Sequence, residues 1–308
     1  MDDTHAGAAI EVLDLEFKMH ETIASFLLRS DDGPVLIETG PESTFEALRR
    51  ALGRAGFRVE DVRHALVTHI HLDHAGAAWR LAEHGATIYV HPVGAPHLVD
   101  PARLLVSARK IYGPQMDSLW GRMGPIAADR VRVLQDAETL RIGGLRIEAL
   151  FTPGHASHHV AYRIDGAVLT GDIAGVRIGD GPVVPPCPPP EVDIEAWRAS
   201  LARLREVAPR RLYLTHFGVV DEVGEHLDQL DAALDAFASW TRARMEQGLA
   251  EEAIVPLFEA YTDGFLAARG AGGEVQRRYA VANPAFMSVA GLARYWRKRA
   301  ERAAAASA

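Results

Sequence analysis

The stretch Thr68-His69-Ile70-His71-Leu72-Asp73-His74 carries the strongest signal in this chain. It places three histidines and one aspartate within six residues, directly after the apolar run Ala65-Leu66-Val67. Side chains alternate across an extended backbone, so we expect His69 and His71 on the same side of it. Neutral imidazole and carboxylate groups are suitable ligands for zinc, iron and manganese. Because an apolar strand leads into the cluster, the pattern favours a metal site over a chance grouping on a polar surface.

Three further apolar strands end in a residue type that binds metals. The segments are Leu150–His155, which ends in Gly-His, Ala167–Asp172, which ends in Gly-Asp, and Leu212–His216, which ends in Thr-His. In layered α/β proteins, sites form at strand ends because the loops converge there. We therefore expect all four strand ends to meet in one site.

In this order, His-x-His-x-Asp-His, Gly-His, Gly-Asp and Thr-His resemble the metallo-β-lactamase fold superfamily, in particular its glyoxalase-II-like hydrolases. The resemblance covers about residues 10–220. It implies an α/β (α+β) fold, a four-layer αββα sandwich. It also implies two metal sites, and no ligand position is replaced. The implied ligands are His69, His71 and His155 for the first metal, Asp73, His74 and His216 for the second, and Asp172 as the bridge between them.

Periodicity indicates alternating strands and helices, followed by helices alone. The expected strands are Ile10–Phe17, Ile23–Arg29, Val35–Glu38, His64–Val67, Thr87–Val90, Val131–Leu134, Leu145–Leu150, Val160–Ile164, Ala167–Leu169 and Arg211–Leu214. The expected helices are Pro41–Ala55, Ala75–His84, irregular helix within 96–123, and one from the cap Asp193 to Val207. We divide the chain into a catalytic domain, 1–220, and a helical C-terminal extension, 221–308.

Composition narrows the class of protein. The 308 residues are 48% hydrophobic, which is enough for a sizeable core. The net charge of −8 disfavours a nucleic-acid partner. The start Met1–Thr4 lacks the pattern of a signal peptide, and no apolar run of about 18 residues exists to span a membrane. We expect a cytoplasmic protein with a small-molecule substrate, and a homodimer stays open.

The leading hypothesis is a dinuclear hydrolase with two divalent ions, zinc first and iron or manganese as alternatives. A metal-bridging hydroxide, oriented by the ligand Asp73, would attack the carbonyl of an ester, thioester or lactone. A lactone substrate is less favoured, because Gly175 and Val176 stand where lactonases of the superfamily often carry a tyrosine. Three alternatives remain. Persulfide dioxygenases of the superfamily keep similar ligands with a single iron, and its ribonucleases cleave phosphodiesters. The third is a non-catalytic binding module, which the intact ligand set disfavours.

Other residues carry weaker signals. His159 either supports a ligand or the substrate from behind or is an ordinary core or surface histidine, whereas His158 is expected to be structural. Cys187, in the proline-rich loop Pro182–Pro190, is expected to pack and not to react. The C-terminal segment Arg277–Arg299 could roof the site, but we slightly favour a basic helix end with its aromatic residues in the core or at a dimer interface.

Overall fold

The computed structural model describes residues 9–306, so Met1–Thr4, on which the prediction of no signal peptide rests, lie outside the described residues. Twelve strands in this range form two sheets of six. The first sheet contains, in spatial order, β1 (Ile10–Asp14), β2 (Ala24–Ser30), β3 (Gly33–Ile37), β4 (His64–Leu66), β5 (Thr87–Val90) and β6 (Val131–Val133). The second contains β12 (Gly218–Val220), β11 (Arg211–Leu214), β10 (Ala167–Gly171), β9 (Val160–Ile164), β8 (Leu145–Phe151) and β7 (Thr139–Ile142).

Both sheets are mixed. In the first sheet β1, β2 and β3 pair antiparallel, and β3 to β6 pair parallel. In the second sheet β10 and β11 form the parallel pair, and the other neighbours run antiparallel.

Helices occupy most of the remaining chain. Those that follow strands of the first sheet are α1 (Phe45–Arg54), α2 (Leu72–Ala75), α3 (Ala78–Glu83), α4 (Ala95–Val99), α5 (Ala102–Tyr112) and α6 (Met116–Trp120). Those of the second half are α7 (Ile194–Val207), α8 (Val223–Glu246), α9 (Glu251–Ala267), α10 (Glu274–Ala282) and α11 (Ala285–Ala306). Short 3₁₀ turns lie at Glu42–Thr44, Val59–Asp61, Gly113–Gln115 and Ala128–Arg130. Among the described residues, no helix is both long and apolar enough to cross a bilayer.

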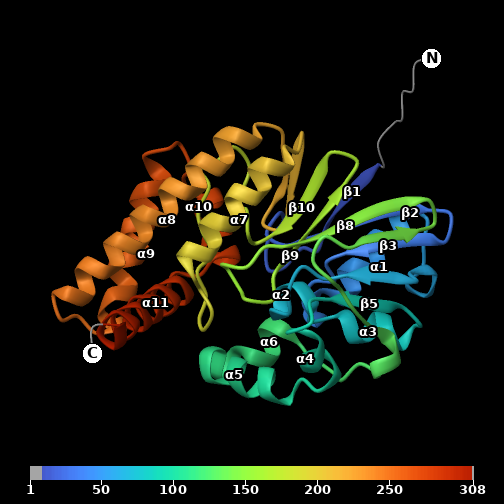
Figure 1. Ribbon diagram of the computed structural model, residues 1–308, viewed down its shortest axis with the longest axis horizontal. Helices are drawn as coiled ribbons and strands as arrows, with labels where there is room; N and C mark the ends of the chain where they lie inside the picture. The colour runs from blue at the N-terminus through green and yellow to red at the C-terminus, as the bar shows by residue number, and fades with distance from the viewer. Residues whose placement is uncertain (1–8, 307–308) are drawn as a thin grey trace.

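Successive side chains of a strand point to opposite faces of its sheet, and the apolar ones form three layers. In β2, Phe26 and Leu28 pack between the sheets, whereas Leu27 faces the layer that contains α1. In β11, Tyr213 packs between the sheets and Leu212 faces the layer that contains α7 and α8. The result is the expected αββα sandwich, with α1 and α3 on one side and α7 and α8 on the other (Figure 1).

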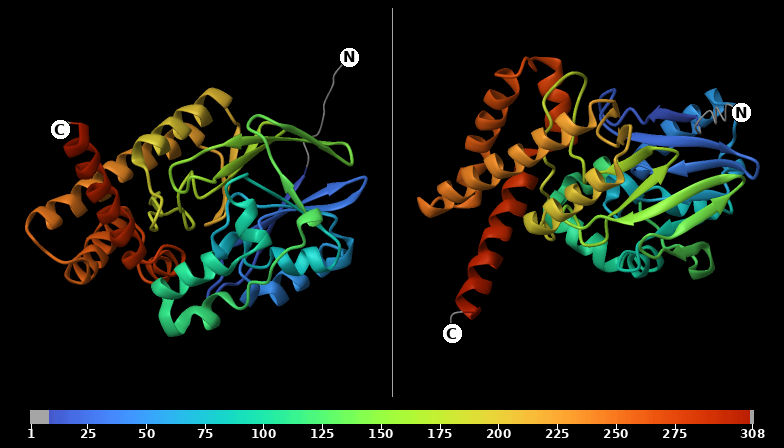
Figure 2. Two further views of the ribbon diagram at one scale, coloured as in Figure 1. Left: turned by 60° about the horizontal axis from the view of Figure 1, so that its bottom comes forward. Right: turned by 45° about the horizontal axis from the view of Figure 1, so that its top comes forward.

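The C-terminal helices share the core of the second sheet. Leu227, Leu230, Leu234 and Phe237 of α8 recur at three- and four-residue steps and are buried in the same cluster as residues of α7, α9 and α11. Both views in Figure 2 place these helices at one end of the sandwich. The division of the chain at residue 220 stays a prediction.

The sequence analysis missed two strands, β7 and β12, and one expected helix is broken. β7 and β8 form a hairpin joined by Gly143 and Gly144, which both have positive φ, as a tight two-residue hairpin loop requires. β12 has only three residues, too few to show a period. The helix expected over Ala75–His84 is divided into α2 and α3 around Gly76, where a Cβ would collide with the carbonyl of Leu72.

The proline-rich loop is held by the C-terminal helices. Tyr279 of α10 donates its hydroxyl proton to the carbonyl of Pro182 at 2.7 Å, and the Asn283 amide donates to the carbonyl of Pro185 at 3.2 Å. A side chain at Gly291 of α11 would collide with the backbone of Cys187. The loop is therefore fixed along α11 and cannot be moved without moving the helix.

The layer between the sheets should carry much of the stability. Leu28 is fully buried there, whereas Leu257 of α9 is 47% exposed. We expect Leu28→Ala to lower the free energy of unfolding by about 2–5 kcal/mol, because it leaves a cavity between two sheets. The matched Leu257→Ala should change it by about 0.5 kcal/mol or less. Urea unfolding of both variants checks this, and equal effects would contradict the layer assignment.

Candidate metal centre

Three histidines converge beyond the ends of one strand from each sheet. His69 and His71 follow β4, and His155 follows β8. The Nε2 atom of His69 lies 2.9 Å from Nδ1 of His71, and Nε2 of His155 lies 3.0 Å from the same atom. The structure thus brings together the three residues expected to hold the first metal.

A second group lies beside it. Nε2 of His74 and Nε2 of His216 lie 3.6 Å and 3.5 Å from the same Asp73 oxygen. Asp73 and His74 are on α2, and His216 follows β11. These are the residues expected to hold the second metal, and their ligand atoms all lie within 4.8 Å of one another.

Asp172, at the end of β10, stands between the two groups. Its Oδ2 atom lies 3.3 Å from Nε2 of His155. Its Oδ1 atom lies 3.3 Å from Nε2 of His74 and 3.4 Å from Nε2 of His216. One carboxylate oxygen therefore faces each group, which is the arrangement that a bridging ligand needs.

Hydrogen bonds on the far side of each ring determine which nitrogen is free. His155 Nδ1 donates to the carbonyl of Pro186 at 2.9 Å, and His216 Nδ1 donates to the carbonyl of Thr22 at 2.6 Å. His74 Nδ1 donates to Glu38 at 3.0 Å. Because Nδ1 carries a proton in all three, Nε2 is the nitrogen directed into the site, and it offers a lone pair whenever the ring is neutral.

Glu38 is a functional residue that the sequence analysis missed. It is fully buried at the end of β3 and binds His74 directly. It also accepts a hydrogen bond from the Thr68 hydroxyl, whose oxygen lies 3.0 Å from His69 Nδ1. Glu38 therefore supports one histidine of each group. The signal was present, since Leu36-Ile37-Glu38 is a further apolar strand that ends in a carboxylate.

His159 supports the site from behind. Its Nδ1 lies 2.9 Å from the Thr152 hydroxyl, and its Nε2 accepts from the backbone N–H of Asp172 at 3.2 Å. The ring is fully buried and holds the turn that presents the Asp172 carboxylate. It does not point a nitrogen at either group of ligands.

The two groups differ in electrostatics. Burial lowers the pKa of His69 and of His71 well below 6.5, and the neighbouring histidines lower it further. Burial also lowers the pKa of His155, although Asp172 opposes the shift. Those three rings are therefore neutral at neutral pH and ready to act as ligands.

In the second group, the effect of the carboxylates on the histidine pKa values is larger than the effect of burial. Burial alone would lower the pKa of His74, but Asp172, Glu38 and Asp73 outweigh it and raise the pKa well above 6.5. Asp172 and Asp73 likewise raise the pKa of His216 against burial. Burial would raise the pKa of Asp73, but His74 and His216 hold it down at about 2.

The donor atoms fit a bound cation. His74 Nε2 and Asp172 Oδ1 are inaccessible to solvent, and apart from the ion pairs of 3.3–3.6 Å within the two groups neither atom makes a hydrogen bond to the described residues. Buried polar atoms without partners are costly in a folded protein. The lone pairs of His69 and His155 also face the same His71 nitrogen at close range. A cation among these atoms would remove both penalties.

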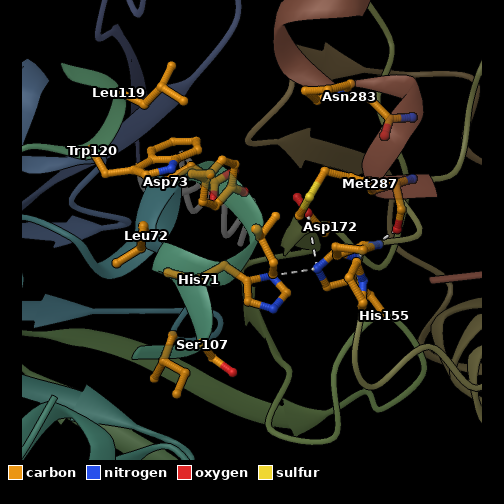
Figure 3. A pocket seen from close by; sticks show the side chains of 18 of the residues that line it. His71, Leu72, Asp73, Ser107, Leu119, Trp120, His155, Asp172, Asn283 and Met287 are labelled. Atoms are coloured by element: carbon orange, nitrogen blue, oxygen red, sulfur yellow. Dashed lines mark hydrogen bonds and ion pairs between the residues drawn. The ribbon is translucent and has the colours of Figure 1, made fainter. Parts of the chain in front are cut away.

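A cavity of about 530 Å³ opens beside the ligands. Figure 3 shows Leu119 and Trp120 on one side of it and Asn283 and Met287 on the other, with the metal-binding side chains between them. Of the second group, Asp73 is the most open, with 21% of its side chain exposed.

The other singled-out residues divide between core and cavity. Cys187 is fully buried and burial raises the pKa of its thiol, so it packs as expected. His158, which was expected to be structural, is buried and borders the cavity. Asp193 caps α7 by accepting from the backbone N–H of Ala196 at 3.0 Å.

The C-terminal segment does both things that were considered for it. Tyr279 and Tyr295 are buried, and Trp296 donates to the carbonyl of Ala238, so these aromatic residues belong to the core. Residues 280–284, 286 and 287 at the α10–α11 corner line the cavity instead. The corner is therefore a wall of the site.

Comparisons with known proteins agree with this geometry. The sequence profile of the Metallo-beta-lactamase superfamily matches residues 21–216. A metallo-beta-lactamase fold-containing protein of Sulfurisphaera tokodaii is 30% identical over 178 residues, which are 56% of this chain and 67% of that protein. A metallo-beta-lactamase family protein of Thermus thermophilus superposes with a TM-score of 0.66 over 94% of each chain at 22% identity, and it shares the fold.

Two further relatives bear the names of enzymes. A hydroxyacylglutathione hydrolase of Shewanella sp. is 30% identical over 107 residues, 35% of this chain and 33% of the relative. An atrochrysone carboxyl ACP thioesterase of Aspergillus fumigatus is 24% identical over 209 residues, 67% of this chain and 54% of the relative. The chain thus matches a third and about half of their lengths. The matched profile spans every ligand of the two groups, and we conclude that this chain belongs to the metallo-beta-lactamase superfamily.

Proposed function

We propose that the chain is a hydrolase that uses two divalent ions, zinc first, to cleave carbonyl esters, with acyl thioesters as the leading class. The observation that carries the proposal is the convergence of two ligand groups on opposite oxygens of Asp172. The names of the two enzyme relatives support the choice of an ester or thioester bond.

The residues have distinct tasks in this proposal. His69, His71 and His155 would hold one ion, and Asp73, His74 and His216 the other, with Asp172 shared. The ions, when bound, would supply Lewis acidity and an activated water. Asp73 reaches the cavity and can accept a hydrogen bond from the attacking water. Glu38, Thr68 and His159 would keep the ligands oriented without contacting the substrate.

Lactones stay a weaker candidate. Gly175 and Val176, at the position where a tyrosine would be expected, are buried on the helix-covered side of the second sheet. No side chain at those positions reaches the cavity. A small-molecule substrate, a cytoplasmic location and a possible homodimer stay predictions.

Metal content distinguishes this proposal from single-iron chemistry. Protein purified without added metal should contain close to two divalent ions per chain and hydrolyse acyl thioesters, with activity lost on chelation and regained with zinc. His155→Ala and His216→Ala should each lose one ion and reduce kcat/KM about 100-fold or more. Elemental analysis with a thioester assay checks this. One iron per chain, with oxygen uptake on a persulfide, would contradict the proposal and favour a dioxygenase.

Glu38 should matter for both ions. Glu38→Gln keeps the size but removes the charge that faces His74 and Thr68, so we expect metal affinity or activity to fall about 10- to 100-fold. Glu148→Gln, on the partly exposed pair with Arg163, is the matched control and should have no effect. Affinities come from competition with a chromophoric chelator. Unchanged metal binding in Glu38→Gln would show that the buried carboxylate does not support the ligands.

The two ions should respond differently to pH. In the metal-free protein the raised pKa values of His74 and His216 mean that an ion at the second group must displace protons. Its apparent affinity should therefore fall between pH 8 and pH 6, by up to about tenfold per pH unit for each displaced proton. The first group, whose pKa values are lowered, should change little over this window. Zinc titrations at three pH values measure this, and equal pH dependence at both sites would overturn it.

A further inference from the structure

One wall of the cavity is a continuous row of aromatic rings. Phe17 and Trp120 stack with ring centres 5.2 Å apart and planes within 7°. Tyr112 meets Trp120 edge-on at 5.1 Å and Phe286 of α11 at 6.3 Å. The row thus links the loop after β1, the helices α5 and α6, and the start of α11. All four side chains line the cavity.

The facing wall comes from the α10–α11 corner. Val281, Pro284 and Met287 line the cavity there, next to Phe286 at the end of the aromatic row, and α5 adds Leu104 and Ile111 to the lining. Phe286 is 39% exposed, although it is a large apolar side chain. Met287 extends from α11 into the space beside the metal ligands (Figure 3). Methionine side chains adapt to the shape of an apolar ligand, and aromatic side chains offer it a large rigid surface.

Apart from Asp73 and Asp172 of the candidate site, the charged side chains that line this cavity are partly or fully exposed. Lys18 and Arg103 line it but are exposed, and the Glu191 side chain is 35% exposed and accepts from Ser157. A charged group placed against the apolar side chains of this lining would lose its hydration, which is costly unless an opposite charge compensates it. An apolar group placed there would gain from the transfer out of water. The size, about 530 Å³, is within the range of small-molecule sites.

We infer, as a deepening of the proposed function on which it rests, that the substrate carries a large apolar acyl group seated between the aromatic row and the α10–α11 corner. The scissile carbonyl would then lie at the Asp73 and Asp172 end of the cavity. Phe286 and Met287 set how large the acyl group can be. Tyr112, Trp120 and Phe17 form the fixed surface against which it packs.

A chain-length series of thioesters tests this. Acetyl, butanoyl, hexanoyl, octanoyl and phenylacetyl esters of one thiol, N-acetylcysteamine, keep the leaving group constant. We expect kcat/KM to rise by up to about fourfold for each added methylene, until the cavity is filled. Phe286→Ala and Met287→Ala should flatten this rise. Phe265→Ala, the same truncation on α9 outside the cavity, is the matched control and should keep it. A flat series in the unaltered protein would overturn the inference.

A binding measurement separates this inference from the proposed reaction. Calorimetric titration of the full chain with octanamide and with acetamide does not depend on hydrolysis. Octanamide should bind about 100-fold more tightly or better, with a negative heat-capacity change, and Phe286→Ala should weaken it. Octanamide binding without hydrolysis of any thioester would refute the proposed function and uphold the apolar site. Hydrolysis without octanamide binding would refute the apolar site alone.

Discussion

The candidate site depends on the compensation of buried polar and charged groups where the strand ends of the two sheets meet. The carboxylates of Glu38 and Asp172 and five histidines, His69, His74, His155, His159 and His216, are all at most 3% exposed. Such groups are tolerated in a protein interior only when hydrogen bonds and opposite charge compensate them. Here the strands end together, and each ring is bonded from behind by a backbone carbonyl, a hydroxyl or Glu38. This requirement determines which loops can lie at this edge.

The C-terminal helices contribute to the site through the proline-rich loop. Tyr279 and Asn283 hold the loop, and the carbonyl of Pro186 in that loop orients His155. The same corner supplies Phe286 and Met287 to the cavity. One segment therefore supports a metal ligand and shapes the space in front of it. Since a fold alone does not determine a substrate, this segment is where the chain can differ from relatives that share the sandwich.

The sequence predicted which side chains converge better than it predicted what surrounds them. His69, His71, Asp73 and His74 lie within one local motif, and the other ligands each end an apolar strand, so short-range patterns were sufficient. Glu38 was overlooked because a single carboxylate after a strand is a weak signal until its neighbours are known. The cavity could not be predicted, because it depends on α5 and α11 meeting across more than 170 residues of chain. Short strands such as β12 have too few residues to show a period.

The central claim is that two ions share Asp172. Anomalous X-ray diffraction at the zinc edge, from crystals grown with zinc, tests it most directly. The account predicts two peaks, one among His69, His71 and His155 and the other among Asp73, His74 and His216, with the Asp172 carboxylate between them. A single peak at saturating zinc, or a second peak that does not contact His216, would contradict it.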